Sequence, residues 1–108
     1  MPRYKIRWTP FASKCLQEIH SYITSEAKSE TPADKFILKL IERTDALKMY
    51  PYIGQGEPML EAIGQSSRYL VEGNYKIIYQ IEKDEVIITD VFHTKQNPIK
   101  LTKRGKKK

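Results

Sequence analysis

The segment from Arg68 to His93 constrains the fold of this chain more than any other part of the sequence. It contains three runs rich in aromatic and β-branched residues, at 68–71, 75–81 and 86–93, which are separated by short polar turns. Such runs are typical of β-strands, and turns this short require neighbouring strands to pair antiparallel. The sequence therefore predicts an antiparallel β-meander with the run 75–81 as its central strand.

The N-terminal half predicts one strand and two helices. Residues 3–8 alternate strictly between basic and apolar side chains, which is the pattern of a half-buried strand with a basic outer face. A threonine followed by proline is a helix-start pattern, and it occurs at Thr9 and again at Thr31. Apolar residues at three- and four-residue spacing extend the first helix to about Lys28 and the second to Tyr50. The short connection predicts an antiparallel helical hairpin.

These elements together predict an α+β fold. Residues 51–65 have no such periodicity and contain three glycines and two prolines, so we interpret them as a crossing loop. The resulting order is β-α-α-β-β-β, in which the helical hairpin packs on one face of a small, mainly antiparallel sheet. We expect the other face to be open, and an exposed sheet face is a natural place for a functional site.

The positive charge of the chain is concentrated at its C-terminal end. The net charge is +6, and residues 100–108 alone contribute six basic residues and no acid, so residues 1–99 sum to zero. We therefore predict a single domain at residues 1–98 and a basic tail at residues 99–108. A lysine-rich end is most often a solvated tail, although it can add non-specific affinity for phosphate.

The sequence favours a cytoplasmic protein without cofactors. No apolar run approaches the roughly 20 residues of a membrane span, and the N-terminus has no signal-peptide pattern. The single cysteine, Cys15, cannot form an internal disulfide, and we expect it to be a small buried hydrophobic residue. No histidine, cysteine and aspartate cluster has metal-ligand spacing. We assign the conspicuous aromatic residues to apolar faces or their margins, as core residues: Trp8, Tyr22, Phe36 and Tyr50.

Three stretches of the sequence resemble a known family: Arg68-Tyr-Leu-Val-Glu-Gly-Asn-Tyr-Lys-Ile-Ile-Tyr-Gln-Ile, Val86-Ile-Ile-Thr-Asp-Val-Phe-His93 and Asn97-Pro98. They are similar to the R-x-L…G-x-Y-R-I-x-Y…V-x-I-x-x-V-x-H pattern in the last three strands of RelE/ParE superfamily toxins. The order of elements matches that superfamily as well. The resemblance implies the toxin of a bacterial type II toxin–antitoxin, or plasmid stabilisation, module. It also implies a cognate antitoxin whose C-terminal segment folds onto the toxin as an amphipathic helix or strand.

The resemblance leaves two activities open, because members of the superfamily act on different targets. RelE-like and YoeB-like toxins cut mRNA on the ribosome, whereas ParE-like toxins poison DNA gyrase and are not nucleases. On the sequence we favour a metal-independent, ribosome-dependent mRNA endoribonuclease that blocks translation. The alternative is a ParE-like gyrase inhibitor that acts by protein–protein contact.

Four residues are the candidates for a nuclease site. Cleavage by a 2′-hydroxyl needs a general base, a general acid and a cation for the charge on the phosphate. The resemblance implies Glu57 as the base, His93 as the acid, and Lys76 and Arg68 as the phosphate-binding cations. Lys76 stands where the family usually has arginine, and it lacks the planar fork of that side chain. Each residue also has an ordinary structural interpretation, and we expect a nuclease to bring all four together on the open face.

Overall fold

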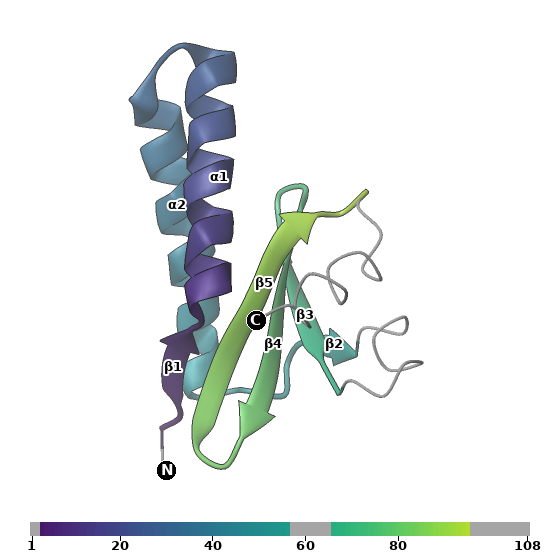
Figure 1. The fold of residues 1–108 in the computed structure, drawn as a ribbon. Coiled ribbons are helices and arrows are strands. Elements are labelled where there is room, and N and C mark those ends of the chain that lie inside the picture. The colour runs from purple at the N-terminus through teal and green to yellow at the C-terminus, as the bar shows by residue number, and fades with distance from the viewer. Residues whose placement is uncertain (1–2, 57–65, 96–108) are drawn as a thin grey trace.

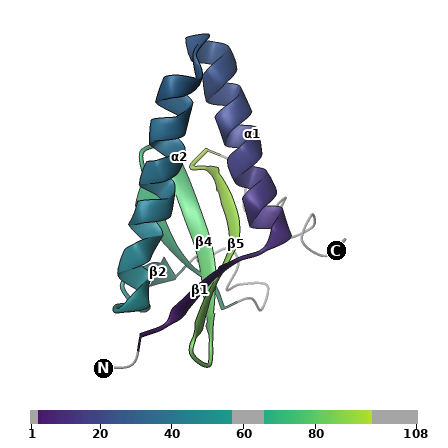
Figure 2. The same cartoon turned by 90° about the vertical axis from the view of Figure 1, so that its left-hand side faces the viewer.

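A five-stranded sheet with a hairpin of two helices on one face forms the fold (Figures 1 and 2). The structure is a computed structural model and describes residues 3–56 and 66–95. The predicted α+β class and helical hairpin are confirmed. The strands lie in the order β1-β5-β4-β3-β2, with these bounds: β1 Lys5–Trp8, β2 Gln55–Gly56, β3 Arg68–Glu72, β4 Tyr75–Glu82 and β5 Glu85–His93.

The predicted antiparallel meander forms the centre of the sheet. Strand β4 pairs antiparallel with β3 on one side and with β5 on the other. Two-residue turns join these strands, and each contains a residue with positive φ, Gly73 at 60° and Lys83 at 55°. Strand β1 adds to the edge of β5 in parallel, which gives the mixed but mainly antiparallel sheet that the sequence predicts. The two-residue strand β2 pairs with β3 and lies within the stretch predicted as a loop.

Helix α1 spans Pro10–Ala27 and has the ends that its sequence predicts. The Thr9 side chain accepts a hydrogen bond from the backbone N–H of Ala12 at 3.0 Å, which satisfies one of the donors left without a partner in the first turn. At the other end Lys28 adopts the left-handed conformation, and its N–H donates to the Thr24 carbonyl. The helix therefore starts and stops where its local sequence dictates.

Helix α2 spans Glu30–Asp45 and differs from the prediction at both ends. Its N-cap is Ser29 instead of Thr31, because the Ser29 hydroxyl accepts a hydrogen bond from the Thr31 N–H at 3.3 Å. A proline in the first turn is compatible with this start, since the first N–H groups of a helix have no intrahelical partner. The chain then tightens into the 3₁₀ turn η1, Ala46–Lys48, so the α-helix ends before the predicted Tyr50.

The main core lies between the hairpin and the sheet. Its fully buried residues come from both layers: Ala12, Leu40, Leu47, Ile77, Tyr79, Val86 and Ile88. Trp8 and Phe36 pack against this core, as predicted, and Cys15 is buried within it. Two predicted core aromatics are exposed instead, Tyr22 by 61% and Tyr50 by 58%. Tyr22 lies in the C-terminal half of α1, and Tyr50 follows the early end of α2.

The face of the sheet opposite the hairpin is not uniformly open. Ile78 and Phe92 point to this face and are 1% and 2% exposed, with Tyr69 packed against them. Register also shifts here, because Ile78 pairs with Asp90 while the next residue, Tyr79, pairs with Ile88, so β5 carries one extra residue. The expectation of a freely exposed second face therefore holds only in part.

Several sequence predictions fall on other parts of the chain. Glu57, Asn97-Pro98 and the basic tail lie outside the described residues, so the boundary at residue 98 stays a prediction. Within residues 3–56 and 66–95, neither helix is long and apolar enough to cross a membrane.

Candidate functional site

Arg68 holds the chain that leads into β2 instead of pointing to the open face. It pairs with Tyr79 across β3 and β4, which places its side chain on the helix-facing side of the sheet. Its guanidinium donates to the Gly54 carbonyl at 2.7 Å and to the Tyr52 carbonyl at 3.3 Å. The same group lies 5.0 Å from the centre of the Tyr52 ring, within the range of a cation–π contact. Arg68 therefore has a structural role, in which its guanidinium group binds backbone carbonyls.

Lys76 projects from the opposite face of the sheet, as the alternation of β4 predicts. Its ammonium lies 4.3 Å from the centre of the Tyr69 ring, another cation–π contact. The Tyr69 hydroxyl in turn donates to the side-chain oxygen of Gln55 at 2.9 Å. Lys76 thus belongs to a polar cluster that links β4, β3 and β2 on the face away from the helices.

His93 returns to the helix-facing side at the far end of β5. It pairs with Tyr75 across β4 and β5, and the two rings make an edge-to-face contact with centres 5.3 Å apart. Its Nδ1 accepts a hydrogen bond from the backbone N–H of Lys95 at 3.2 Å, so the imidazole caps the end of the strand. This geometry matches the capping interpretation of a strand-end histidine.

The three described candidates therefore do not converge. Arg68 and His93 share a face, but their partners on β4 are Tyr79 and Tyr75, four residues or about 13 Å apart along the strand. Lys76 lies on the other face. The fourth candidate, Glu57, is outside the described residues. Among residues 3–56 and 66–95 there is also no group of three or more His, Cys, Asp or Glu side chains that could hold a metal ion.

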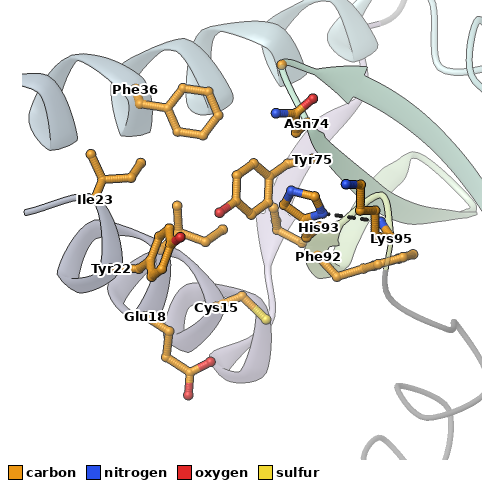
Figure 3. A pocket seen from close by; sticks show the side chains of 13 residues that line it. Cys15, Glu18, Tyr22, Ile23, Phe36, Asn74, Tyr75, Phe92, His93 and Lys95 are labelled. Atoms are coloured by element: carbon orange, nitrogen blue, oxygen red, sulfur yellow. Dashed lines mark hydrogen bonds between the residues drawn. The ribbon is translucent and has the colours of Figure 1, made fainter. Parts of the chain in front are cut away.

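A groove lies beside His93 in the described part of the chain. It has a volume of about 730 Å³ and lies between α1, α2 and the ends of β4 and β5 (Figure 3). Tyr75 stands at its centre, in contact with Phe36 of α2 on one side and with His93 on the other. Its lining is mainly apolar, with a few polar groups: Cys15, Glu18, Ile19, Tyr22, Ile23, Phe36, Gly73, Asn74, Tyr75, Val91, Phe92, His93 and Lys95.

Local geometry brings the hairpin close to the sheet at this groove. Gly73 turns the chain from β3 to β4 with φ at 60°, and a Cβ there would lie 3.2 Å from the Phe36 ring. Burial raises the pKa of the Tyr75 hydroxyl above its ordinary value of 10.0, and the nearby Tyr22 hydroxyl raises it further. Tyr75 is therefore a neutral hydrogen-bonding group at physiological pH. The groove can hold an apolar segment and offers phenol hydroxyls, an imidazole and both charge signs at its margins.

Most of the groove was not foreseen from the sequence. The alternation of β4 places Tyr75 on the helix-facing side, and the spacing of α1 places Cys15 and Ile19 there as well. These patterns predict a closed core at such positions. The signal that could have located the groove is Tyr22, a large aromatic residue about one helical turn beyond Ile19 on the same helix.

Comparison with known families decides what kind of protein this is. Residues 6–98 match the family described as ParE toxin of the type II toxin–antitoxin system parDE. The chain belongs to the ParE toxin family. The match covers both helices and all five strands except Lys5 of β1, and it confirms the superfamily to which the meander and hairpin point.

Two solved structures from toxin–antitoxin systems have the same fold. A chain of the chromosomal ParDE toxin–antitoxin system from P. aeruginosa superposes with a TM-score of 0.69 at 17% identity, over 84% of this chain and 96% of that one. A chain of the toxin–antitoxin complex RelBE2 from Mycobacterium tuberculosis superposes with a TM-score of 0.58 at 19% identity. This superposition covers 86% of this chain and 93% of that one. At these identities the likeness concerns the fold. No curated protein matches the sequence.

Proposed function

We propose that this type II toxin acts by protein–protein contact on DNA gyrase, as the ParE-like branch of the superfamily does, and that it is not an mRNA endoribonuclease. The divergence of Arg68, Lys76 and His93 carries the proposal. RNA cleavage needs a general acid, a general base and a cation that all come within hydrogen-bonding distance of the reacting atoms at one phosphate. A side chain on each face of the sheet cannot meet that requirement at one phosphate.

The contacts of each candidate support the same conclusion. The Arg68 guanidinium is already bound to two backbone carbonyls, which compete with a phosphate for its planar fork. The His93 ring caps the end of β5 and packs edge-on against Tyr75. The sequence-based preference for a nuclease came from the presence of Glu57 together with His93, and we expected a nuclease to bring the four candidates together on the open face. The match to a ParE family model adds support for the non-catalytic alternative.

An antitoxin partner fits the groove. The two solved structures described above belong to toxin–antitoxin systems. We propose that the antitoxin places the apolar side of a C-terminal segment against Tyr75 and Phe36, where it removes apolar surface from water. Tyr22 lies at the margin and is 61% exposed, so Tyr22→Ala should leave the fold intact. We expect it to weaken antitoxin binding by about 10-fold in calorimetry, as for a typical aromatic anchor.

The deciding experiment measures both activities in parallel. Induction of the wild type should arrest growth, inhibit gyrase supercoiling in vitro and produce no new ribosome-dependent mRNA ends. Lys76→Ala should behave like the wild type, because the proposed mechanism does not use the second face of the sheet. New mRNA cuts that disappear in Lys76→Ala, with supercoiling unaffected by the purified toxin, would establish the nuclease instead. Coexpression of the neighbouring antitoxin gene should restore growth.

A further inference from the structure

A short exposed segment follows η1 and lies apart from the groove. It comprises residues 49–53, here called the 49–53 loop, and it leads from the base of α2 toward β2 (the teal stretch in Figure 1). Four of its five side chains are large, apolar or aromatic, and exposed: Met49 by 41%, Tyr50 by 58%, Tyr52 by 61% and Ile53 by 48%. Within the described residues, this is the longest run of exposed large hydrophobic side chains.

The 49–53 loop is held rigidly at both ends. Pro51 is buried, and its carbonyl accepts a hydrogen bond at 2.7 Å from the hydroxyl of the fully buried Tyr79. The same hydroxyl accepts a hydrogen bond from the Gly54 N–H at 2.9 Å. The Tyr50 N–H donates to the Ala46 carbonyl at 2.9 Å, and Arg68 binds the Tyr52 carbonyl. The core therefore fixes the backbone and leaves the side chains in solvent.

Rigid, exposed aromatic side chains are the typical anchors of protein–protein interfaces. Tyrosine offers a large apolar surface with few rotatable bonds, so little side-chain entropy is lost when it is buried by a partner. A contiguous apolar patch on a small protein also has a cost in solubility unless a partner covers it. Nothing in the packing of the core requires Tyr50 or Tyr52 to be aromatic, because both project away from it.

The charges around the 49–53 loop indicate the chemistry of the partner. Arg68 lies over the Tyr52 ring, and Arg43 acts electrostatically on the Tyr79 hydroxyl that binds Pro51. Lys48 precedes the loop and pairs with Asp45 at 3.4 Å. Among these described residues the cations outnumber the single acid, so an acidic surface with apolar pockets is the complementary one.

We propose that the 49–53 loop is the surface with which this toxin binds its protein target, through an acidic surface whose apolar pockets receive Tyr50 and Tyr52. This inference rests on the proposed function, in which the toxin acts by contact and not by catalysis. The loop adjoins Arg68 and Tyr79, whereas the groove adjoins His93 and Tyr75 at the far end of the sheet (Figure 1). The target and the antitoxin therefore bind different surfaces.

The test compares Tyr50→Ser combined with Tyr52→Ser against Leu38→Ser. Leu38 is 54% exposed on α2 and is the matched control for loss of an exposed apolar side chain outside both surfaces. We expect the double variant to need at least about 10-fold more protein for growth arrest and for gyrase inhibition, while Leu38→Ser stays at the wild-type level. Antitoxin affinity and thermal midpoint should be unchanged in both variants, which excludes unfolding as the cause.

The readouts separate failure of this inference from failure of the proposed function. If the wild type inhibits gyrase and the double variant inhibits it equally well, the 49–53 loop is not the binding surface although the function holds. If the wild type arrests growth without affecting gyrase and the double variant no longer arrests growth, the loop is right and gyrase is the wrong target. Loss of binding to a single-stranded RNA oligonucleotide in the double variant would overturn the inference, because exposed tyrosines also stack on bases.

Discussion

The hydroxyl of Tyr79 offers the sharpest test of how the sheet positions the 49–53 loop. Tyr79 is completely buried in the core, yet its hydroxyl donates to the Pro51 carbonyl at 2.7 Å and accepts from the Gly54 N–H at 2.9 Å. Tyr79→Phe keeps the ring and removes one oxygen. The substitution therefore changes the connection between the core and the loop while leaving the apolar packing almost unaltered.

The expected loss of stability follows from the two backbone groups that lose their partner. A buried donor or acceptor without a hydrogen bond costs about 1–3 kcal/mol, so two such groups predict a loss of about 2–6 kcal/mol in the free energy of unfolding. For a domain of about 100 residues each kcal/mol lowers the thermal midpoint by about 4 °C. Tyr79→Phe should therefore melt about 8–24 °C below the wild type.

Differential scanning calorimetry of the purified toxin measures this shift directly. Tyr69→Phe is the matched control, because its hydroxyl binds the Gln55 side chain at 2.9 Å in an exposed position. It should change stability by less than about 0.5 kcal/mol, as surface substitutions usually do. Equal midpoints for Tyr79→Phe and the wild type would refute the reasoning, since the buried hydroxyl would then contribute nothing to holding the loop.

Three further predictions concern the same fold. Gly54→Ala should destabilise the toxin more than Tyr79→Phe in a urea titration, because a Cβ at residue 54 would meet the Tyr79 hydroxyl and lie 2.8 Å from the Tyr69 backbone oxygen; an unchanged midpoint would count against this close packing. Thr9→Ala should cost about 1 kcal/mol by loss of the N-cap of α1, and Thr9→Ser, which keeps the hydroxyl, should retain most of the stability in the same titration. Burial raises the pKa of Tyr79 above 10.0, so above pH 10 the folded chain retains a proton that the unfolded chain loses. The contribution of this group to the free energy of unfolding is therefore fully present below pH 10 and falls as the pH rises further. Urea midpoints at pH 9 and pH 11 should show a smaller decrease in Tyr79→Phe than in the wild type, and an equal decrease would assign the effect to other groups.

Local sequence patterns predicted most of the fold because they act over a few residues. The alternation of β4, the threonine N-cap before Pro10 and the short turn at Gly73 each specify their own element without help from the rest of the chain. Where two local signals compete, prediction was less successful. Ser29 and Thr31 both carry a hydroxyl that can cap α2, and the structure uses Ser29.

The candidate site was harder to predict because side-chain direction depends on register between strands. Alternation along β4 places Lys76 on the face away from Tyr75 and Tyr79, and this was foreseen. It does not say that Arg68 lies opposite Tyr79 and His93 opposite Tyr75, since those pairings depend on where the turns fall and on the extra residue in β5. The convergence that a nuclease requires could therefore not be judged before the strands were paired.

The meander from Arg68 to His93 shows which features the sequence determines and which the tertiary structure determines. By itself the sequence determined the strands, their antiparallel pairing and the resemblance to RelE/ParE toxins, because period-two alternation and turn chemistry are local properties of the chain. Only the tertiary structure decided that Arg68 binds the backbone beside Tyr52, that His93 caps a strand beside a groove, and that Tyr50 stands in solvent. These outcomes depend on contacts between segments that are distant in the sequence. Burial and hydrogen bonding across the whole domain determine which of these contacts form.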